Sequence, residues 1–264
     1  RIGIGMIKKS FFISIFPKIF NEILGVGIAK KALDNGIIDY EVVNPMNFLD
    51  HKERLDDTTY GGGPGMLLKA QPLIESIDFC KSKANKKTKV IYLSPQGQVF
   101  NQSISRELAK EDKLIFLCGR YEGIDHRVID SRVDLEISLG DYVLSGGEIA
   151  ALALHDSICR NYEGFLGDEN SLSEESFEKN LLEYPQFTKP RESKFGNVPD
   201  VLLSGDHKKI SDWRRKQSLG KTFINRRDLF SKLELSDQDI KILKEFLSEV
   251  GYDSDRISDL LEEI

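Results

Sequence analysis

The stretch Leu114-Ile-Phe-Leu-Cys-Gly-Arg-Tyr-Glu-Gly-Ile-Asp125 carries the strongest indication of the fold. It opens with a short apolar run, typical of a buried strand, and continues into a polar loop with two glycines. Residues 10–16, 39–43 and 89–93 also have the composition of strands. Helical spacing separates several of these segments, so the sequence predicts an α/β domain built on a parallel sheet.

The predicted helices of this domain lie between and after the strands. Pro17 suits the first turn of a helix, whose apolar spacing continues until Gly36 offers a stop. Further helices are expected near 103–110 and over 149–158. The last of these is apolar and directly follows a glycine-rich turn.

The carboxyl-terminal part of the chain differs in composition from the part before it. Residues 168–180 are acidic and rich in serine, which indicates a linker. Ser236, with Asp239 three residues later, predicts a capped helix, and Ser254 is placed to cap another. The apolar face expected for the first of these helices is Ile240, Leu243, Phe246, Leu247 and Val250. The predicted divisions are an α/β domain over 6–165, a linker over 166–184 and a small helical domain over 185–264.

Composition excludes several classes of protein. The chain has 264 residues, of which 40% are hydrophobic and 30% charged, enough apolar content for a packed core. No run approaches the roughly 20 apolar residues of a membrane helix. Three distant cysteines argue against a disulfide framework and against a zinc site. We therefore expect a reduced, cytoplasmic protein that starts naturally at Met6, with no role for residues 1–5.

Charge is distributed unevenly along the chain, whose net charge is −6. Between Lys189 and Arg227, 11 Lys and Arg stand against 4 Asp and Glu, a local charge of +7. From Asp228 onward the counts are 4 and 11, a local charge of −7. The basic segment could hold phosphates. The alternative is a surface whose charges pair with the acidic tail.

Glycine-rich loops are the candidate ligand sites. Tyr60–Met66 contains four glycines, which let backbone N–H groups approach a ligand closely. It is neither a P-loop nor a dinucleotide fingerprint. Leu93–Gly97 and Leu117–Asp125 follow predicted strands, where ligands bind in open α/β sheets. Leu139–Glu148 is a fourth such segment, rich in glycine. Each loop alone could also be an ordinary turn.

Together these segments resemble the bacterial tRNA (guanine-N1)-methyltransferase family, TrmD, of the SPOUT class. The similarity covers about residues 6–250, in the family's order and spacing. The motifs that carry it are YGGGPGM (60–66), YLSPQG (92–97), CGRYEGID (118–125), GDYVLSGGE (140–148), DSICR (156–160), GFLG (164–167), LLEYPQFTKP (181–190), VLLSGDH (201–207) and WRRKQSLG (213–220).

The resemblance implies a fold and a reaction. The fold is a trefoil-knotted parallel sheet flanked by helices, with a small carboxyl-terminal helical domain. The reaction is methyl transfer from S-adenosyl-L-methionine to N1 of the guanosine 3′-adjacent to the tRNA anticodon, position 37. Family members are homodimers with each site built across the interface. The family is associated with Mg²⁺, but the sequence shows no recognisable ligand set, and His155 is expected to be structural.

The family's donor pocket carries over to three loops. The matching positions are Leu93, Ser94, Gly119, Tyr121, Glu122, Leu139, Gly140, Asp141, Tyr142, Val143, Leu144, Gly146 and Gly147. Their glycine content suits recognition of adenine by the backbone. Arg120 and Glu122 are expected to position the methionine end of the donor or the guanine.

The family's chemistry needs a base, because guanine N1 is a poor nucleophile until its proton leaves. The resemblance assigns this role to Glu175, where the family has Asp, with Asp168 and Glu174 in reserve. It assigns Arg160, after the helix over 149–158, to the charge that develops on guanine O6. The longer arm of Glu leaves an alternative open, a knotted tRNA-binding protein with little or no turnover.

The basic segment gains a role from the same resemblance. Arg214, Arg215 and Lys216 beside Trp213 suit the phosphates of the anticodon stem and a stacked base. Lys189 stands where the family commonly has Arg and lacks the fork of a guanidinium. From composition alone, a different nucleotide-dependent α/β enzyme also stays possible.

Overall fold

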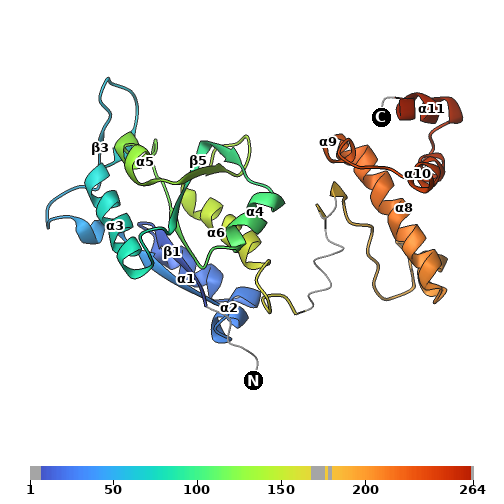
Figure 1. Ribbon diagram of the computed structural model, residues 1–264, viewed down its shortest axis with the longest axis horizontal. Coiled ribbons are helices and arrows are strands. Elements are labelled where there is room, and N and C mark those ends of the chain that lie inside the picture. Colours follow the sequence, from blue (N-terminus) through green and yellow to red (C-terminus); the bar gives the residue numbers. More distant parts are fainter. Residues whose placement is uncertain (1–6, 168–175, 178–179, 263–264) are drawn as a thin grey trace. The chain divides into compact units, whose positions relative to one another are not determined.

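The computed structural model describes residues 7–167, 176–177 and 180–262. The chain divides into two compact units, Arg1–Asp168 and Glu169–Ile264 (Figure 1). In the described residues no helix combines the length and apolar character that crossing a membrane requires.

Unit 1, residues 1–168, is built on a five-stranded sheet in the order β2-β1-β6-β5-β7. Every pairing in it is parallel, which confirms the predicted α/β class. The strands are β1 (Lys8–Ile13), β2 (Ile38–Val43), β5 (Lys89–Val99), β6 (Lys113–Leu117) and β7 (Leu135–Ser138). The predicted strand over 10–16 ends earlier, at Ile13, because Pro17 opens a helix only four residues later. The threading of a knot stays a prediction.

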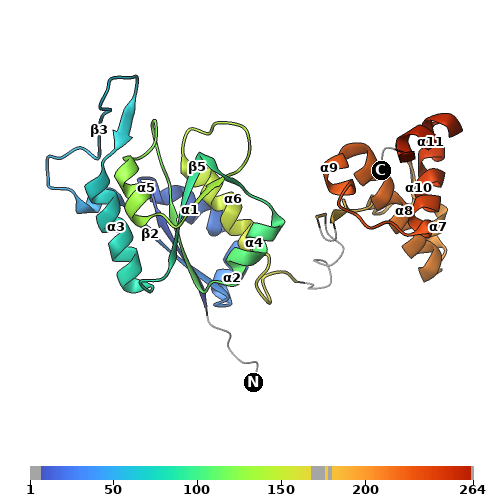
Figure 2. The same ribbon diagram turned by 45° about the horizontal axis from the view of Figure 1, so that its top comes forward.

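Helices cover both faces of this sheet. In the two ribbon views α3 and α5 lie together on one side, and α4 and α6 lie on the other (Figures 1 and 2). Each face has its own buried core, one centred on Phe12 and Phe116 and the other on Phe11 and Ile115. The helices are α1 (Pro17–Leu24), α2 (Gly27–Asp34), α3 (Ala70–Lys83), α4 (Gln102–Ala109), α5 (His126–Arg132) and α6 (Gly147–Cys159), with a 3₁₀ turn η1 (Pro45–Phe48).

The predicted helix from Pro17 toward Gly36 is in fact two helices. Val26 is extended, and Gly27 has φ +62°, a left-handed conformation that interrupts the helical path. The apolar spacing continues across this break, so periodicity alone could not reveal it.

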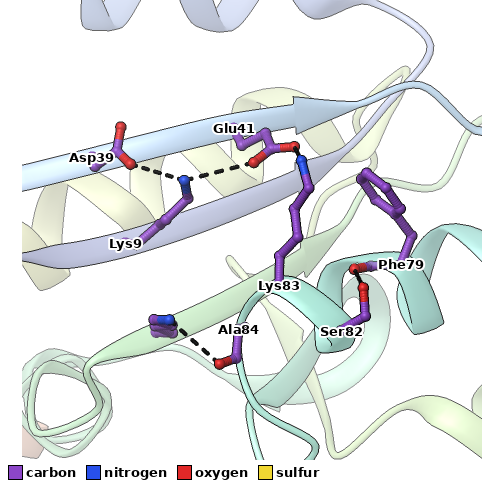
Figure 3. Close-up of polar contacts among 8 residues, drawn as sticks. Lys9, Asp39, Glu41, Phe79, Ser82, Lys83 and Ala84 are labelled. Carbon is purple, nitrogen blue, oxygen red and sulfur yellow. Dashed lines mark hydrogen bonds and ion pairs between the residues drawn. The ribbon is translucent and has the colours of Figure 1, made fainter.

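Charged side chains tie the edge strand β2 to its neighbours (Figure 3). Lys9 on β1 contacts Asp39, its register partner on β2, at 2.9 Å and Glu41 at 3.6 Å. Glu41 also pairs with Lys83 of α3 at 2.5 Å. Such surface pairs stabilise little individually. They place charge along the strand that would otherwise offer an open edge.

Unit 2, residues 169–264, is mainly helical in its described part. Its helices are α7 (Asp200–Leu203), α8 (His207–Asn225), α9 (Arg227–Phe230), α10 (Asp237–Glu249) and α11 (Ser254–Glu262), and a short hairpin joins β8 (Glu192–Ser193) to β9 (Gly196–Asn197). The core includes Phe223, Phe230, Leu243 and Phe246. Gly220 lets α8 and α10 approach, because a Cβ there would collide with the Phe246 ring.

The helix signals in unit 2 were largely correct. Ser236 and Asp239 form the predicted capping box. Val250 was wrongly placed on the apolar face, since it follows the last turn of α10 and is 49% exposed. At the start of α11 the side chain of Asp253, rather than Ser254, accepts the N–H of Arg256 at 2.8 Å.

Candidate functional site

A pocket of about 370 Å³ opens at a bulge within β5 and where β6 and β7 end. β5 pairs with β7 up to Leu93 and again from Gln98, so the intervening residues bulge out of the ladder. This bulge, the loop after β6 and the loop between β7 and α6 line the pocket. The lining residues are Tyr92, Leu93, Ser94, Pro95, Gln96, Gly119, Arg120, Tyr121, Glu122, Gly123, Ile124, His126, Ile129, Glu136, Ile137, Ser138, Leu139, Tyr142, Val143, Leu144, Gly146, Gly147 and Ala150.

The structure brings together the three loops that the sequence singled out. Of the predicted donor-site residues, all but Gly140 and Asp141 line the pocket. Gly140 and Asp141 belong to the loop between β7 and α6 but do not line the pocket.

Backbone contacts hold two of these loops against each other. Gly147 N–H donates to Gly119 O at 2.9 Å, and Arg120 forms an isolated antiparallel bridge with Gly146. A Cβ on Gly147 would lie 2.9 Å from Cys118 Cα, and one on Gly146 would collide with the Arg120 guanidinium. Glycine is therefore required here for close approach of the loops.

Tyr92 and Glu136 form a part of the pocket that sequence reasoning missed. They are register partners on β5 and β7 and so project from the same face of the sheet. Burial, and secondarily the charge of Glu136, raise the pKa of the Tyr92 phenol to about 12, so it stays protonated. Glu136 lies in a four-residue strand that was not predicted. Tyr92 lies within a quoted motif and ends an apolar run, which could have signalled it.

The glycine-rich segment over 60–66 also reaches this site. It joins β3 (Asp56–Thr58) to β4 (Met66–Leu68). Glu122 N–H donates to Met66 O at 3.1 Å, and Leu68 N–H donates to Gly123 O at 3.1 Å. A Cβ on Gly65 would collide with the Glu122 side chain. The first motif therefore supports the loop that follows β6, and Tyr60 at its tip is fully exposed.

Arg160 does not line the pocket of its own chain. It caps the carboxyl end of α6, whose first residue, Gly147, does line it. Ala150, in the first turn of α6, also lines the pocket, and Arg160 follows ten residues later, about 15 Å along the helix at roughly 1.5 Å per residue. That distance exceeds the reach of an arginine side chain. The predicted base Glu175, and the reserve candidates Asp168 and Glu174, lie outside the described residues.

His155 is a core residue, as predicted. Its ring packs edge-on against Phe12 at 5.3 Å and lies 3.4 Å from Cys159 Sγ. Burial lowers its pKa to about 4, so the imidazole is neutral at physiological pH. Across the described ranges, no three His, Cys, Asp or Glu side chains gather as a metal site.

Two cations of the basic segment in unit 2 form ion pairs with acidic side chains of the same unit. Arg215 Nε contacts Asp239 at 2.8 Å, and Lys216 Nζ contacts Glu249 at 2.6 Å. Both acids belong to α10, so for these two cations the alternative of pairing with the acidic tail is correct. Arg214 instead lies over the Tyr184 ring, 4.7 Å from its centroid.

Comparison with known proteins places the chain in a family. Residues 8–232 match the family model described as tRNA (Guanine-1)-methyltransferase TrmD. A tRNA (guanine-N(1)-)-methyltransferase of Dictyoglomus turgidum is 46% identical over 239 residues, covering 90% of this chain and 96% of the relative. That of Sodalis glossinidius is 48% identical over 238 residues, covering 90% and 95%. That of Shewanella loihica is 46% identical over 237 residues, covering 89% and 96%. The pocket loops and these matches agree, and the chain belongs to the TrmD family of tRNA (guanine-1)-methyltransferases.

Proposed function

We propose that this chain transfers a methyl group from S-adenosyl-L-methionine to N1 of the guanosine at position 37 of tRNA, next to the anticodon. Family membership supports the reaction class. The observation that carries the site assignment is the convergence of three motif segments on one pocket at the bulge of β5 and the carboxyl ends of β6 and β7. A tRNA substrate also implies work in the cytoplasm, which stays a prediction.

The pocket fits the proposed donor. Its volume lies in the range of small-molecule sites, about 300–1,000 Å³. Leu93, Leu139 and Leu144 offer apolar surface for a purine, and the glycines leave backbone amides accessible beside it. The donor, when bound, supplies a methyl group on a sulfonium. The protein's part is to hold that group still and keep water away from it.

The acceptor side needs a base and a cation, which the resemblance assigns to residues other than those that line the pocket. We assign Glu175 to take the proton from guanine N1, which leaves an electron pair for attack on the methyl carbon. We assign Arg160 to stabilise the negative charge that moves to O6. Both assignments rest on matching motif positions.

A second copy of the chain would supply Arg160. Because Arg160 lies about 15 Å along the helix from Ala150, the last residue of α6 that lines the pocket, we propose a homodimer in which each arginine serves the partner's pocket. The exposed face of α6, which includes Ile149, Ala153 and Asp156, is available for such an approach.

Subunit mixing tests this arrangement. Gly146→Val should block the donor pocket of one chain, and Arg160→Ala should remove the acceptor-side arginine of another. Each variant alone should be inactive, whereas mixed dimers should regain one working site. Failure of mixing to restore any activity, with exchange of subunits demonstrated, would place Arg160 in its own chain's site.

We assign the described part of 185–264 to tRNA binding, with linker 166–184 joining it to the donor-binding domain 6–165. Lys194 and Lys208 are exposed and suit phosphate contacts better than Arg215 and Lys216, which are paired with α10. Magnesium dependence stays a prediction from the resemblance.

The decisive experiment is a search by mass spectrometry for N1-methylguanosine. The pure chain is incubated with the donor and with tRNA carrying G37, and in parallel with the same tRNA carrying A37. N1-methylguanosine is expected only with G37. Binding of both donor and tRNA without any methylated product would overturn the proposal in favour of a binding protein without turnover.

A further inference from the structure

Three segments of unit 1 meet at one buried ion pair beside the pocket. Glu148, in the first turn of α6, is only 1% exposed. Its carboxylate contacts Arg120 Nη2 at 2.9 Å and accepts a hydrogen bond from the Ser14 hydroxyl at 2.7 Å. Ser14 follows β1, Arg120 follows β6 and Glu148 follows the loop after β7. The contacts therefore join parts of the chain that are distant in sequence.

Arg120 makes further contacts that fix its orientation. Nη1 donates to Ser145 O at 3.1 Å, and the guanidinium lies over the Phe16 ring, 4.5 Å from its centroid. Its backbone bridges to Gly146. The side chain thus contacts protein groups at the pocket wall, whereas the resemblance implied that it positions the methionine end of the donor or the guanine.

The chemistry of the pair suits positioning better than added stability. A buried carboxylate is costly unless it is paired, and an ion pair at such a site often stabilises no more than apolar packing would. The start of α6 favours the negative charge of Glu148. Arginine, unlike lysine, can bind a carboxylate and a carbonyl oxygen at once in a fixed plane. What the pair supplies is therefore a defined geometry.

We propose that Arg120 and Glu148, held by Ser14, are a positioning pair that fixes the distance between the pocket walls 119–124 and 139–147 before the donor enters. The two walls carry most of the predicted donor contacts. The inference rests on the proposed function only for the identity of the ligand, because the geometry itself exists without one.

Arg120→Lys tests the pair, because lysine keeps the charge but cannot reach Glu148 and the Ser145 carbonyl together. Arg132→Lys is the matched control. Arg132 also contacts a carboxylate, Asp78, at 2.9 Å and donates to a backbone carbonyl, Ser131 O, at 3.1 Å, yet it does not line the pocket.

Hydrogen exchange on the ligand-free protein reports how firmly the wall 139–147 is held against the wall 119–124. In Arg120→Lys the amides of 139–147 should exchange about 10-fold faster than in the wild type, because the closed arrangement is less populated. Calorimetry with S-adenosyl-L-methionine in the absence of tRNA should then show Kd raised by about the same factor. Methyl transfer at saturating donor should fall much less than kcat/KM for the donor. Arg132→Lys should match the wild type in all three measurements.

Several outcomes would overturn the positioning role. One is a lower Tm for Arg120→Lys with unchanged exchange over 139–147 and unchanged donor Kd, which is what a purely stabilising residue would show. Should Arg120→Lys fail to fold, Ser14→Ala keeps Arg120 and Glu148, removes the hydrogen bonds that the Ser14 hydroxyl makes with Glu148 and Phe16 N–H, and should raise exchange over 139–147 to a smaller extent. Wild-type exchange in Ser14→Ala would then refute the inference. If the wild type binds no S-adenosyl-L-methionine, the proposed function fails, whereas the exchange measurements still decide the role of the pair.

Discussion

Gly147 occupies a close backbone contact between α6 and the loop after β6, and Gly147→Ala tests whether that contact shapes the pocket. The new Cβ would lie 2.9 Å from Cys118 Cα and 3.1 Å from Gly119 N. Carbon atoms pack at about 3.5–4.0 Å, so the helix start must shift by roughly 0.6–1 Å. The obstructing atoms are backbone and cannot rotate away.

The expected cost follows from this shift. Overpacking of this kind costs about 1–3 kcal/mol, and stretching the Gly147 to Gly119 hydrogen bond, 2.9 Å in the wild type, removes about 1 kcal/mol more. The better helix propensity of alanine returns at most about 1 kcal/mol. The net cost is about 1–3 kcal/mol, so at about 2–4 °C per kcal/mol for a domain of this size Tm should fall by roughly 2–12 °C. Because Gly119 and Gly147 both line the pocket, donor Kd should rise at least about 10-fold.

Thermal unfolding and calorimetry with S-adenosyl-L-methionine measure the two effects. Gly167→Ala is the control, because a Cβ there meets nothing within 4 Å and its φ is compatible with alanine. The control should leave Tm within about 1 °C of the wild type. Wild-type Tm and donor Kd in Gly147→Ala would refute the claim that backbone contact between these loops sets the shape of the pocket.

Other predictions concern the proposed chemistry, pH and unit 2. Glu175→Gln should abolish methyl transfer in the mass-spectrometric assay while donor Kd measured by calorimetry stays unchanged; retained transfer would move the base elsewhere. Stability should fall as pH is lowered from about 6.5 to 4, since His155 is neutral when folded with a pKa of about 4, whereas the unfolded chain takes up a proton below about 6.5. Urea unfolding should show His155 contributing a loss of about 2 kcal/mol between pH 6.5 and 5, and His155→Gln should flatten that part of the profile; an unchanged slope would contradict the buried neutral state. Arg215→Gln should lower Tm without changing the salt dependence of tRNA binding, because Arg215 already pairs with Asp239; a smaller salt slope in filter binding would return it to the RNA interface.

Local sequence signals predicted the elements that are long or strongly marked. The apolar strands β1, β5 and β6 and the capping box at Ser236 follow from patterns of a few neighbouring residues. β7 was missed because four residues with a central glutamate do not form an apolar run. The break at Gly27 was missed because the apolar spacing on either side continues through it.

The candidate site likewise combines features that the sequence could predict with contacts that it could not. The glycine-rich loops were visible in the sequence because each is a contiguous motif. The pairing of Ser14 with Glu148, 134 residues apart, depends on how the sheet orders its strands and leaves no trace in either motif. The opposite charges of the basic segment and the tail offered such pairing as an alternative, but the sequence could not say that Arg215 and Lys216 would be the cations matched by acids of α10.

The length of α6 determines where Arg160 lies relative to the pocket. Its first residue borders the pocket, and the residue after its last turn is Arg160. Adding or removing one residue between them would turn Arg160 by about 100° and displace it by about 1.5 Å. The length of α6 therefore sets the distance from the pocket to Arg160. A chain with a longer or shorter α6 would keep its fold, but its Arg160 guanidinium would no longer point to where we expect the guanine.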